Sequence, residues 1–247
     1  MGIQDNSFFV EEAYNQEAGV VQHISSVQVN FASGANEVIP SFTQEWPLFS
    51  QTHQLSYTVQ SDFTENESGF GDVRLNYRLQ ALMETAKWPA FAPRLTLVLP
   101  TGDEHKGLGV GGVGFETNLP FSKVVSNRWT LHFNAGMSVF PDVHSHGLTN
   151  YNLGGSAIYA VSRDFNLMLE AVGGWSEEVT FNRRYSVVDR MTNALISPGA
   201  RYAFNCPNDL QIVVGAAVPI GLTSDSPDWG LFFYLSFEHP FVRSQKR

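Results

Sequence analysis

Apolar and polar residues alternate along many stretches of this chain, and residues 69–80 show the alternation most plainly. Val73, Leu75, Tyr77 and Leu79 are apolar, and every residue between them is polar. A period of two indicates a β-strand, because successive side chains point to opposite faces of a sheet. One face of this strand is apolar and the other carries two arginines, which suits either a soluble sheet or the wall of a membrane barrel.

The alternation recurs along the whole chain and predicts an all-β protein. The clearest example is 128–139, where Trp129, Leu131 and Phe133 share one face and Asn134 belongs to the other. Segments with strand character lie at 7–14, 19–31, 50–59, 69–80, 91–100, 109–119, 128–139, 150–161, 165–175, 196–205, 210–218 and 230–241. No linker or change of composition separates these segments, so we interpret residues 1–247 as one domain.

The connections between these segments differ in length. Residues 162–164 and 206–209 form tight turns. The longer and more polar connections are 101–108, 141–148, 176–195 and 221–228. Short turns at one rim and long loops at the other are typical of an outer-membrane β-barrel. We expect 176–195, which is too long for a turn, to lie on the extracellular side as a loop folded over the mouth.

Aromatic residues gather at the predicted strand ends. They are Trp88, Trp129, Tyr151, Phe165, Trp175, Tyr202 and Trp229. Trp and Tyr concentrate at the two interfaces of a membrane. The alternative is that they are core aromatics of a soluble ligand-binding barrel. We favour a single transmembrane antiparallel β-barrel, with the lipid bilayer and the outer-membrane assembly machinery as its partners.

Parity sets the expected number of strands. If the last strand ends on the periplasmic side, the strand at 19–31 runs in the same direction as the last one. An even count then requires an earlier strand of opposite direction, which 7–14 can supply, and the total is about twelve.

Composition limits the alternatives. The chain has 247 residues, of which 43% are hydrophobic and 16% charged, and a formal charge of −9. This charge disfavours a general affinity for nucleic acid. The single cysteine, Cys206, allows no internal disulfide, and no apolar run is long enough for a transmembrane helix. Met1 is not followed by a signal-peptide pattern, so we expect the mature form of a bacterial outer-membrane protein.

Several motifs carry a family resemblance. They are residues 9–17 and 19–23 near the amino terminus, Gly69-Phe70-Gly71-Asp72, Pro93-Arg94-Leu95 and Leu99-Pro100-Thr101-Gly102. With them the chain resembles the outer-membrane transporters of the family named after the meta-pathway of phenol degradation. The resemblance implies a Gram-negative β-barrel that passes aromatic or other hydrophobic small molecules, without a cofactor.

The polar faces supply the candidate solute-binding residues of the lumen. They are Arg74, Asn76, Arg78, Arg94, Glu116, Arg128, His132, Glu170, Arg201 and Glu238. Free arginines would bind a carboxylate through two hydrogen bonds, so we hypothesise a weak anion preference set by Arg74, Arg78 and Arg94. The alternative is that the arginines pair with Asp72, Glu116, Glu170 and Glu238, and that a plugged lumen makes the barrel structural or lipid-interacting.

Other chemistry has weaker support in the sequence. His132, Ser138 and Ser156 would suit a barrel hydrolase, but the chain has no Gly-x-Ser-x-Gly motif, so we expect no catalytic residues. His144 and His146 form a lone His-x-His pair in a polar loop, which we interpret as solvated rather than metal-binding. The glycines of 109–114 do not open a helix, so we expect them to let the barrel wall bend or large neighbours pack.

Overall fold

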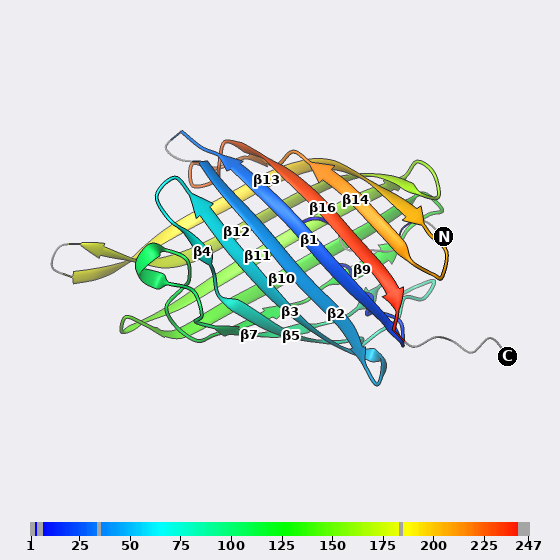
Figure 1. Cartoon of the computed structure of the whole chain (residues 1–247), viewed down its shortest axis with the longest axis horizontal. Helices are drawn as coiled ribbons and strands as arrows, with labels where there is room; N and C mark the ends of the chain where they lie inside the picture. The colour runs from blue at the N-terminus through cyan, green and yellow to red at the C-terminus, as the bar shows by residue number, and fades with distance from the viewer. Residues whose placement is uncertain (1–2, 4–6, 34–35, 183–184, 242–247) are drawn as a thin grey trace.

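The computed structural model describes residues 3, 7–33, 36–182 and 185–241. It shows one closed antiparallel β-barrel of twelve wall strands (Figure 1). Neighbours in sequence pair along the wall, and β1 (Val20–Phe31) pairs with β16 (Trp229–Pro240) to close it. The predicted fold class is therefore confirmed. No helix in the described part of the chain is long and apolar enough to cross a membrane.

The wall strands differ in length and some are interrupted. In order after β1 they are β2 (Asn36–Leu48), β3 (Ser50–Thr64), β5 (Val73–Leu79), β7 (Arg94–Leu99), β8 (Gly114–Asn118), β10 (Trp129–Val143), β11 (His146–Ala160), β12 (Phe165–Asn182), β13 (Tyr185–Asn205), β14 (Gln211–Ala217) and β16. Short strands extend them: β4 (Ser68–Phe70), β6 (Ala90–Phe91), β9 (Phe121–Val124) and β15 (Ile220–Gly221). One 3₁₀ turn, η1 (Glu104–Lys106), lies in the loop between β7 and β8.

The two ends of the barrel are distinct (Figure 1). We call the end from which β12 and β13 project as a long hairpin the hairpin rim. The opposite end, where β1 begins and β16 ends, is the terminal rim. The turns at 162–164 and 206–209 lie at the terminal rim, and the loop 101–113 lies at the hairpin rim.

The predicted faces of the strands are correct. On β10, Phe133 is 48% exposed on the outside of the barrel, whereas Asn134 is 4% exposed and faces the lumen. On β5, Leu75 is exposed while Asn76 and Arg78 are buried inside. Because the side chains follow the period of the pleat, the outer wall presents a continuous apolar surface to its surroundings.

The aromatic residues form two outward-facing bands. Trp129 lies toward the terminal rim beside Tyr159, and Tyr151 lies toward the hairpin rim beside Trp175. From Trp129 to Met137, which pairs with Tyr151, the strand rises about 20 Å at about 3.3 Å per residue and a tilt of about 40°. This separation fits the apolar band of an outer-membrane barrel, which is about 25 Å tall.

Two expectations about the wall are wrong, although the number of strands is right. Residues 7–14 are not a strand but lie inside the barrel, and β2 takes the missing place in the wall. The alternation in β2 is hard to recognise for two reasons. Pro40 has no amide hydrogen and is uncommon within strands, and Ile39 is an apolar residue on the otherwise polar inner face. Because β1 pairs antiparallel with β16, it runs opposite to the last strand and not with it.

The expected loop at 176–195 is also wrong. β12 and β13 stay paired from Ser176–Met191 up to Asn182–Tyr185, so this region is a two-stranded extension of the wall. It carries charges such as Glu177, Glu178 and Arg190. Beyond the barrel both faces of a hairpin meet water, so the alternation that reveals a strand is lost there.

Candidate functional site

The lumen is occupied by the chain's own N-terminal segment, which we define as residues 7–16. Val10, Ala13 and Asn15 in this segment are almost fully buried. The segment is not part of the sheet, so its backbone N–H and C=O groups need other partners. The inward side chains of the wall supply them.

Glu170 on β12 binds the start of the segment. Its two carboxylate oxygens accept hydrogen bonds from the backbone N–H groups of Phe8 (3.2 Å), Phe9 (2.9 Å) and Val10 (3.1 Å). The side chain is fully buried. Such a set of N–H donors stabilises a buried carboxylate.

Arg78 on β5 binds the end of the segment. Its guanidinium donates to the carbonyl oxygens of Glu12 (3.2 Å) and Tyr14 (2.7 Å) and to Oδ1 of Asn15 (2.8 Å). It also donates to Oε1 of Gln54 on β3 (3.2 Å). The planar guanidinium can serve several acceptors at once, so one wall residue fixes several positions of the segment.

Neutral side chains complete the attachment. Asn134 on β10 accepts from the N–H of Glu11 (2.8 Å) and donates to its carbonyl oxygen (2.9 Å). Gln80 accepts from the N–H of Asn15 (2.8 Å) and donates to the carbonyl oxygen of Ala13 (2.8 Å). These reciprocal pairs resemble the ladder of a β-sheet, with side-chain amides in place of a neighbouring strand.

The predicted arginines are mostly engaged. Nη2 of Arg94 lies 3.0 Å from a carboxylate oxygen of Glu11 in the segment. Nε of Arg74 lies 3.5 Å from Oε1 of Glu116, which is one of the carboxylates expected to pair with the arginines. With Arg78 bound to the segment, all three residues of the anion hypothesis have partners. The free guanidinium that this hypothesis needs is therefore not found at Arg74, Arg78 or Arg94.

The other side of the segment is apolar. The rings of Phe8 and Phe9 lie 5.3 and 4.9 Å from the ring of Phe232 on β16, centroid to centroid. Gly199 on β13 and Gly215 on β14 face Phe8 so closely that a Cβ at either position would lie within 2.8 Å of the ring. The wall glycines thus form the seat of an aromatic side chain.

Two of the candidate hydrolase residues, His132 and Ser156, take part in holding the segment, whereas Ser138 pairs with Glu116 in the wall. His132 Nδ1 is 2.7 Å from Oγ of Ser122, and the same hydroxyl accepts from the N–H of Ala13 (2.7 Å). Ser156 is bonded through its hydroxyl to that of Ser7 (2.7 Å). The hydroxyls of both serines, Ser122 and Ser156, therefore bind the segment.

The remaining predicted lumen residues stay within the wall or at the terminal rim. Asn76 bonds Ser56 and Thr96 on the neighbouring strands. Glu238 is half-buried near the end of β16, opposite Gln22 and Gln211 in the ladder.

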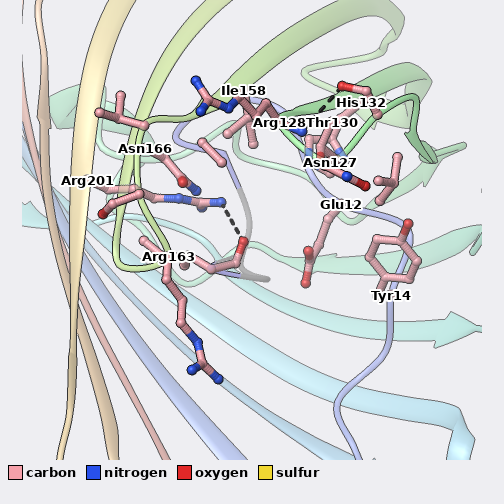
Figure 2. Close-up of a pocket in the computed structure, with 16 residues that line it drawn as sticks. Glu12, Tyr14, Asn127, Arg128, Thr130, His132, Ile158, Arg163, Asn166 and Arg201 are labelled. Carbon is pink, nitrogen blue, oxygen red and sulfur yellow. Dashed lines mark hydrogen bonds between the residues drawn. The ribbon is translucent and has the colours of Figure 1, made fainter. Parts of the chain in front are cut away.

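A cavity of about 810 Å³ opens at the terminal rim, between the segment and the wall (Figure 2). We call it the vestibule. Arg128, directly before β10, and Arg201 of β13 reach into it, and Glu12 and Tyr14 face them from the segment (Figure 2). A smaller cavity of about 340 Å³ lies at the hairpin rim and includes Arg74. The segment lies between the two.

The loop between β7 and β8 folds inward at the hairpin rim. The carboxylate of Asp72 accepts from the N–H groups of Gly102 (3.0 Å) and Val110 (2.8 Å). Gly111 has a φ of 83°, a backbone conformation that favours glycine. Residues 109–112 belong to this loop, so the expectation that they are part of a strand is wrong. Gly114 is in β8 and gives room to the Phe140 ring, which confirms the packing role for this glycine.

The two histidines of the His-x-His pair do not converge. His144 lies 3.4 Å from a carboxylate oxygen of Glu104, and His146 Nε2 is 2.9 Å from Oγ of Ser186. Over the described residues, no group of three or more His, Cys, Asp or Glu could hold a metal ion.

A clasp at the terminal rim holds the end of the segment. The Tyr14 hydroxyl donates to the carboxylate of Glu84, which is 3.0 Å from Nζ of Lys123. Burial alone would raise the pKa of Glu84, but the hydrogen bonds from Tyr14 and Lys123 outweigh it and hold this pKa below its ordinary value. Burial, together with the Glu84 carboxylate, raises the pKa of Tyr14.

Comparison with known proteins decides the family. A family model described as "Putative MetA-pathway of phenol degradation" matches residues 3–238. The chain belongs to this family. The match includes the N-terminal segment as well as the wall. Among curated proteins, none matches the sequence.

Solved structures similar to this member of the family are outer-membrane barrels. The COG4313 outer membrane channel from Pseudomonas putida F1 is 12% identical, with a TM-score of 0.68 over 96% of this chain and 99% of that one. The NanC porin is 8% identical, with a TM-score of 0.51 over 87% and 98%. The KdgM porin is also 8% identical, with a TM-score of 0.51 over 90% and 99%. These likenesses show that the chain shares the β-barrel fold of these proteins.

Sequence reasoning identified the inward residues but not what they bind. The signal for the segment was present in residues 7–16, where Phe8 and Phe9 are adjacent, as are Glu11 and Glu12, so apolar and polar residues do not alternate over a full strand length. The inward glycines at 199 and 215 were a second signal, because strand glycines often mark a close approach by other atoms. Neither signal on its own shows that residues 7–16 enter the barrel.

Proposed function

We propose that this protein is a passive outer-membrane channel for small molecules with an apolar or aromatic body. The observation that carries the proposal is a lumen with a cavity on each side of a segment that is held by hydrogen bonds, ion pairs and packing alone. Such a segment can shift without breaking a covalent bond, and a shift would join the two cavities. The likeness to outer-membrane channels supports the same reading.

The lumen suits apolar solutes better than sugars. Phe8, Phe9, Phe232 and Tyr234 form an aromatic group in its interior, with ring centroids 4.9 to 5.5 Å apart. Aromatic rings stack on such surfaces in offset or edge-on arrangements. The family description, which refers to phenol degradation, supports aromatic solutes as well.

The test is uptake into liposomes that contain the purified protein. We expect phenol-sized neutral aromatics to enter faster than a sugar of similar mass, relative to liposomes without protein. Phe8→Ala should alter the aromatic preference, while Phe133→Ala on the lipid face should leave it unchanged. Equal rates for both solutes in the wild type would contradict the preference.

A structural barrel is the second candidate. The dense attachment of the segment at Glu170 and Arg78 supports it, because so many contacts would keep the lumen closed. Planar-bilayer recording separates the two functions. A channel shows conductance steps, whereas a permanently closed barrel shows none under any applied voltage.

A further inference from the structure

The vestibule at the terminal rim has an unusual charge for this chain. Three guanidinium groups line it, those of Arg128, Arg163 and Arg201, against the single carboxylate of Glu12. The chain as a whole carries a formal charge of −9. Three of the arginines of an acidic protein therefore face one cavity, where a concave wall strengthens their field.

These arginines come from three separate elements of the wall. Arg128 directly precedes β10, Arg163 lies in the turn between β11 and β12, and Arg201 belongs to β13. Figure 2 shows Arg128 and Arg201 approaching the cavity from different directions, with Arg163 below them. The arrangement surrounds a volume of about 810 Å³ and does not line up along one strand.

Contacts within the protein orient two of the guanidinium groups. Arg128 donates to the Tyr159 hydroxyl (2.7 Å) and lies 5.9 Å above its ring. Arg201 is buried, and its Nη2 is 3.5 Å from the carbonyl oxygen of Ile3. Because a guanidinium carries five N–H donors, Arg128 retains donors for a ligand while Tyr159 holds it.

The rest of the lining combines polar side chains, such as Asn127, Thr130 and Ser162, with an aliphatic group. Ile158, Ala160 and Val161 form an aliphatic floor. Asn166, which is 2% exposed, also lines the cavity, and its Oδ1 has no hydrogen-bond partner among the residues that the structure describes. This oxygen is itself enclosed by protein atoms, so the arginines and the aliphatic side chains are the groups that a ligand can contact.

We propose that the vestibule is a binding site for organic acids with an apolar body. The acid group would bind Arg128, Arg163 and Arg201, and the apolar body would lie on Ile158 and Val161. The proposal rests on the proposed channel function and names the class of solute that the channel retains at its terminal rim.

The opposite rim has the opposite character. The cavity at the hairpin rim is lined by the carboxylates of Asp62, Asp72, Glu104, Glu177 and Glu178, and by Arg74 and His144. An organic anion is disfavoured there and favoured in the vestibule. The vestibule is thus the place in the lumen where such an anion accumulates.

The test compares two fluorescent probes that share one ring system. 1-Anilinonaphthalene-8-sulfonate carries an anionic group, and N-phenyl-1-naphthylamine does not. We expect wild-type protein in zwitterionic-lipid nanodiscs to bind the sulfonate, and the double variant R128Q/R163Q to bind it at least about tenfold more weakly. Both residues are exposed at the rim, so these substitutions leave the barrel core intact.

Controls separate charge at this site from charge in general. R190Q removes an exposed arginine of the hairpin rim and should leave sulfonate binding unchanged. Binding of the neutral amine should be equal in the wild type and the double variant. Equal sulfonate binding by the wild type and R128Q/R163Q, or an equal loss in R190Q, would overturn the proposal.

Failure of the channel function has a different signature. If wild-type liposomes take up no neutral aromatic solute, the proposed function is wrong, whatever the probes show. If neutral uptake is present but sulfonate binding is independent of Arg128 and Arg163, the channel stands and the acid site is wrong.

Discussion

At the scale of single residues, each wall position has one of two environments. Side chains at alternate positions face either an apolar exterior or the N-terminal segment. Phe133 and Asn134 are adjacent in sequence, yet one is at the outer surface and the other bonds the backbone of Glu11. A substitution therefore acts on membrane insertion or on the attachment of the segment, according to its parity.

Phe133→Arg tests the outer face. A charge near the middle of the apolar band should cost about 2–4 kcal/mol of unfolding free energy, measured by refolding into lipid vesicles in urea. Phe49→Arg is the matched control, since Phe49 is 94% exposed in the turn between β2 and β3. A cost for Phe49→Arg as large as that for Phe133→Arg would show that the apolar band is misplaced.

Glu170→Gln tests the attachment of the segment. The amide keeps one acceptor oxygen but places N–H donors where the carboxylate accepted from Phe8, Phe9 and Val10. A hydrogen bond to a charged group contributes about 1.5–3 kcal/mol, so the open probability in planar bilayers should rise about tenfold or more. Glu178→Gln, on the hairpin, should not change it.

At the scale of elements, turns and extensions decide what the two rims do. The turn between β5 and β6 contributes Glu84, which fixes the end of the segment through Tyr14. The β12–β13 hairpin extends the wall beyond the aromatic band at Tyr151 and Trp175. The alternation of apolar and polar residues therefore does not predict the contacts of either element.

The clasp at Glu84 should respond to acid. Because the pKa of Glu84 is lowered in the folded protein, its stabilising contribution is complete above the ordinary glutamate pKa of about 4.3 and is lost as pH falls through the lower folded value. We expect channel opening in the wild type to rise between about pH 5 and pH 3. Glu84→Gln should show the open behaviour already at pH 6, while Glu65→Gln behaves as wild type.

The orientation of the hairpin can be measured with cysteine labels at opposite rims. Cys206 lies in the turn between β13 and β14 at the terminal rim, and Arg190 is 83% exposed on the hairpin. If the hairpin is extracellular, a membrane-impermeant maleimide should label Arg190→Cys in a Cys206→Ser background on intact cells. It should label wild-type Cys206 only after the outer membrane is permeabilised. The reverse pattern would invert the barrel.

At the scale of the whole molecule, the sequence specified the wall better than its contents. The alternation in β5 and β10 predicted the inner and outer faces, since burial repeats there every second residue. It could not locate the segment, because residues 7–16 gain their structure from residues of distant strands. β2 was missed because Pro40 and Ile39 interrupt its pattern, and the vestibule was missed because its arginines come from three elements.

The apolar exterior as a whole carries a simple prediction. Large apolar side chains such as Leu95, Phe115, Leu169 and Phe233 are all more than 40% exposed, so the outer wall exceeds the apolar patch that a soluble protein tolerates. The protein should remain dispersed in nonionic detergent and precipitate when the detergent is removed without lipid. A monodisperse peak in detergent-free size-exclusion chromatography would contradict it.

The N-terminal segment contacts residues that are far away in the sequence, and this separation bears on the order of folding steps. Phe8 bonds a residue 162 positions away in the chain, and Ala13 one that is 109 positions away. Contacts so distant in sequence are unfavourable before the intervening chain has formed the wall, because closing such a long loop costs conformational entropy. We therefore expect residues 7–16 to dock after the wall has closed, when the interior of the barrel is still wide and filled with water.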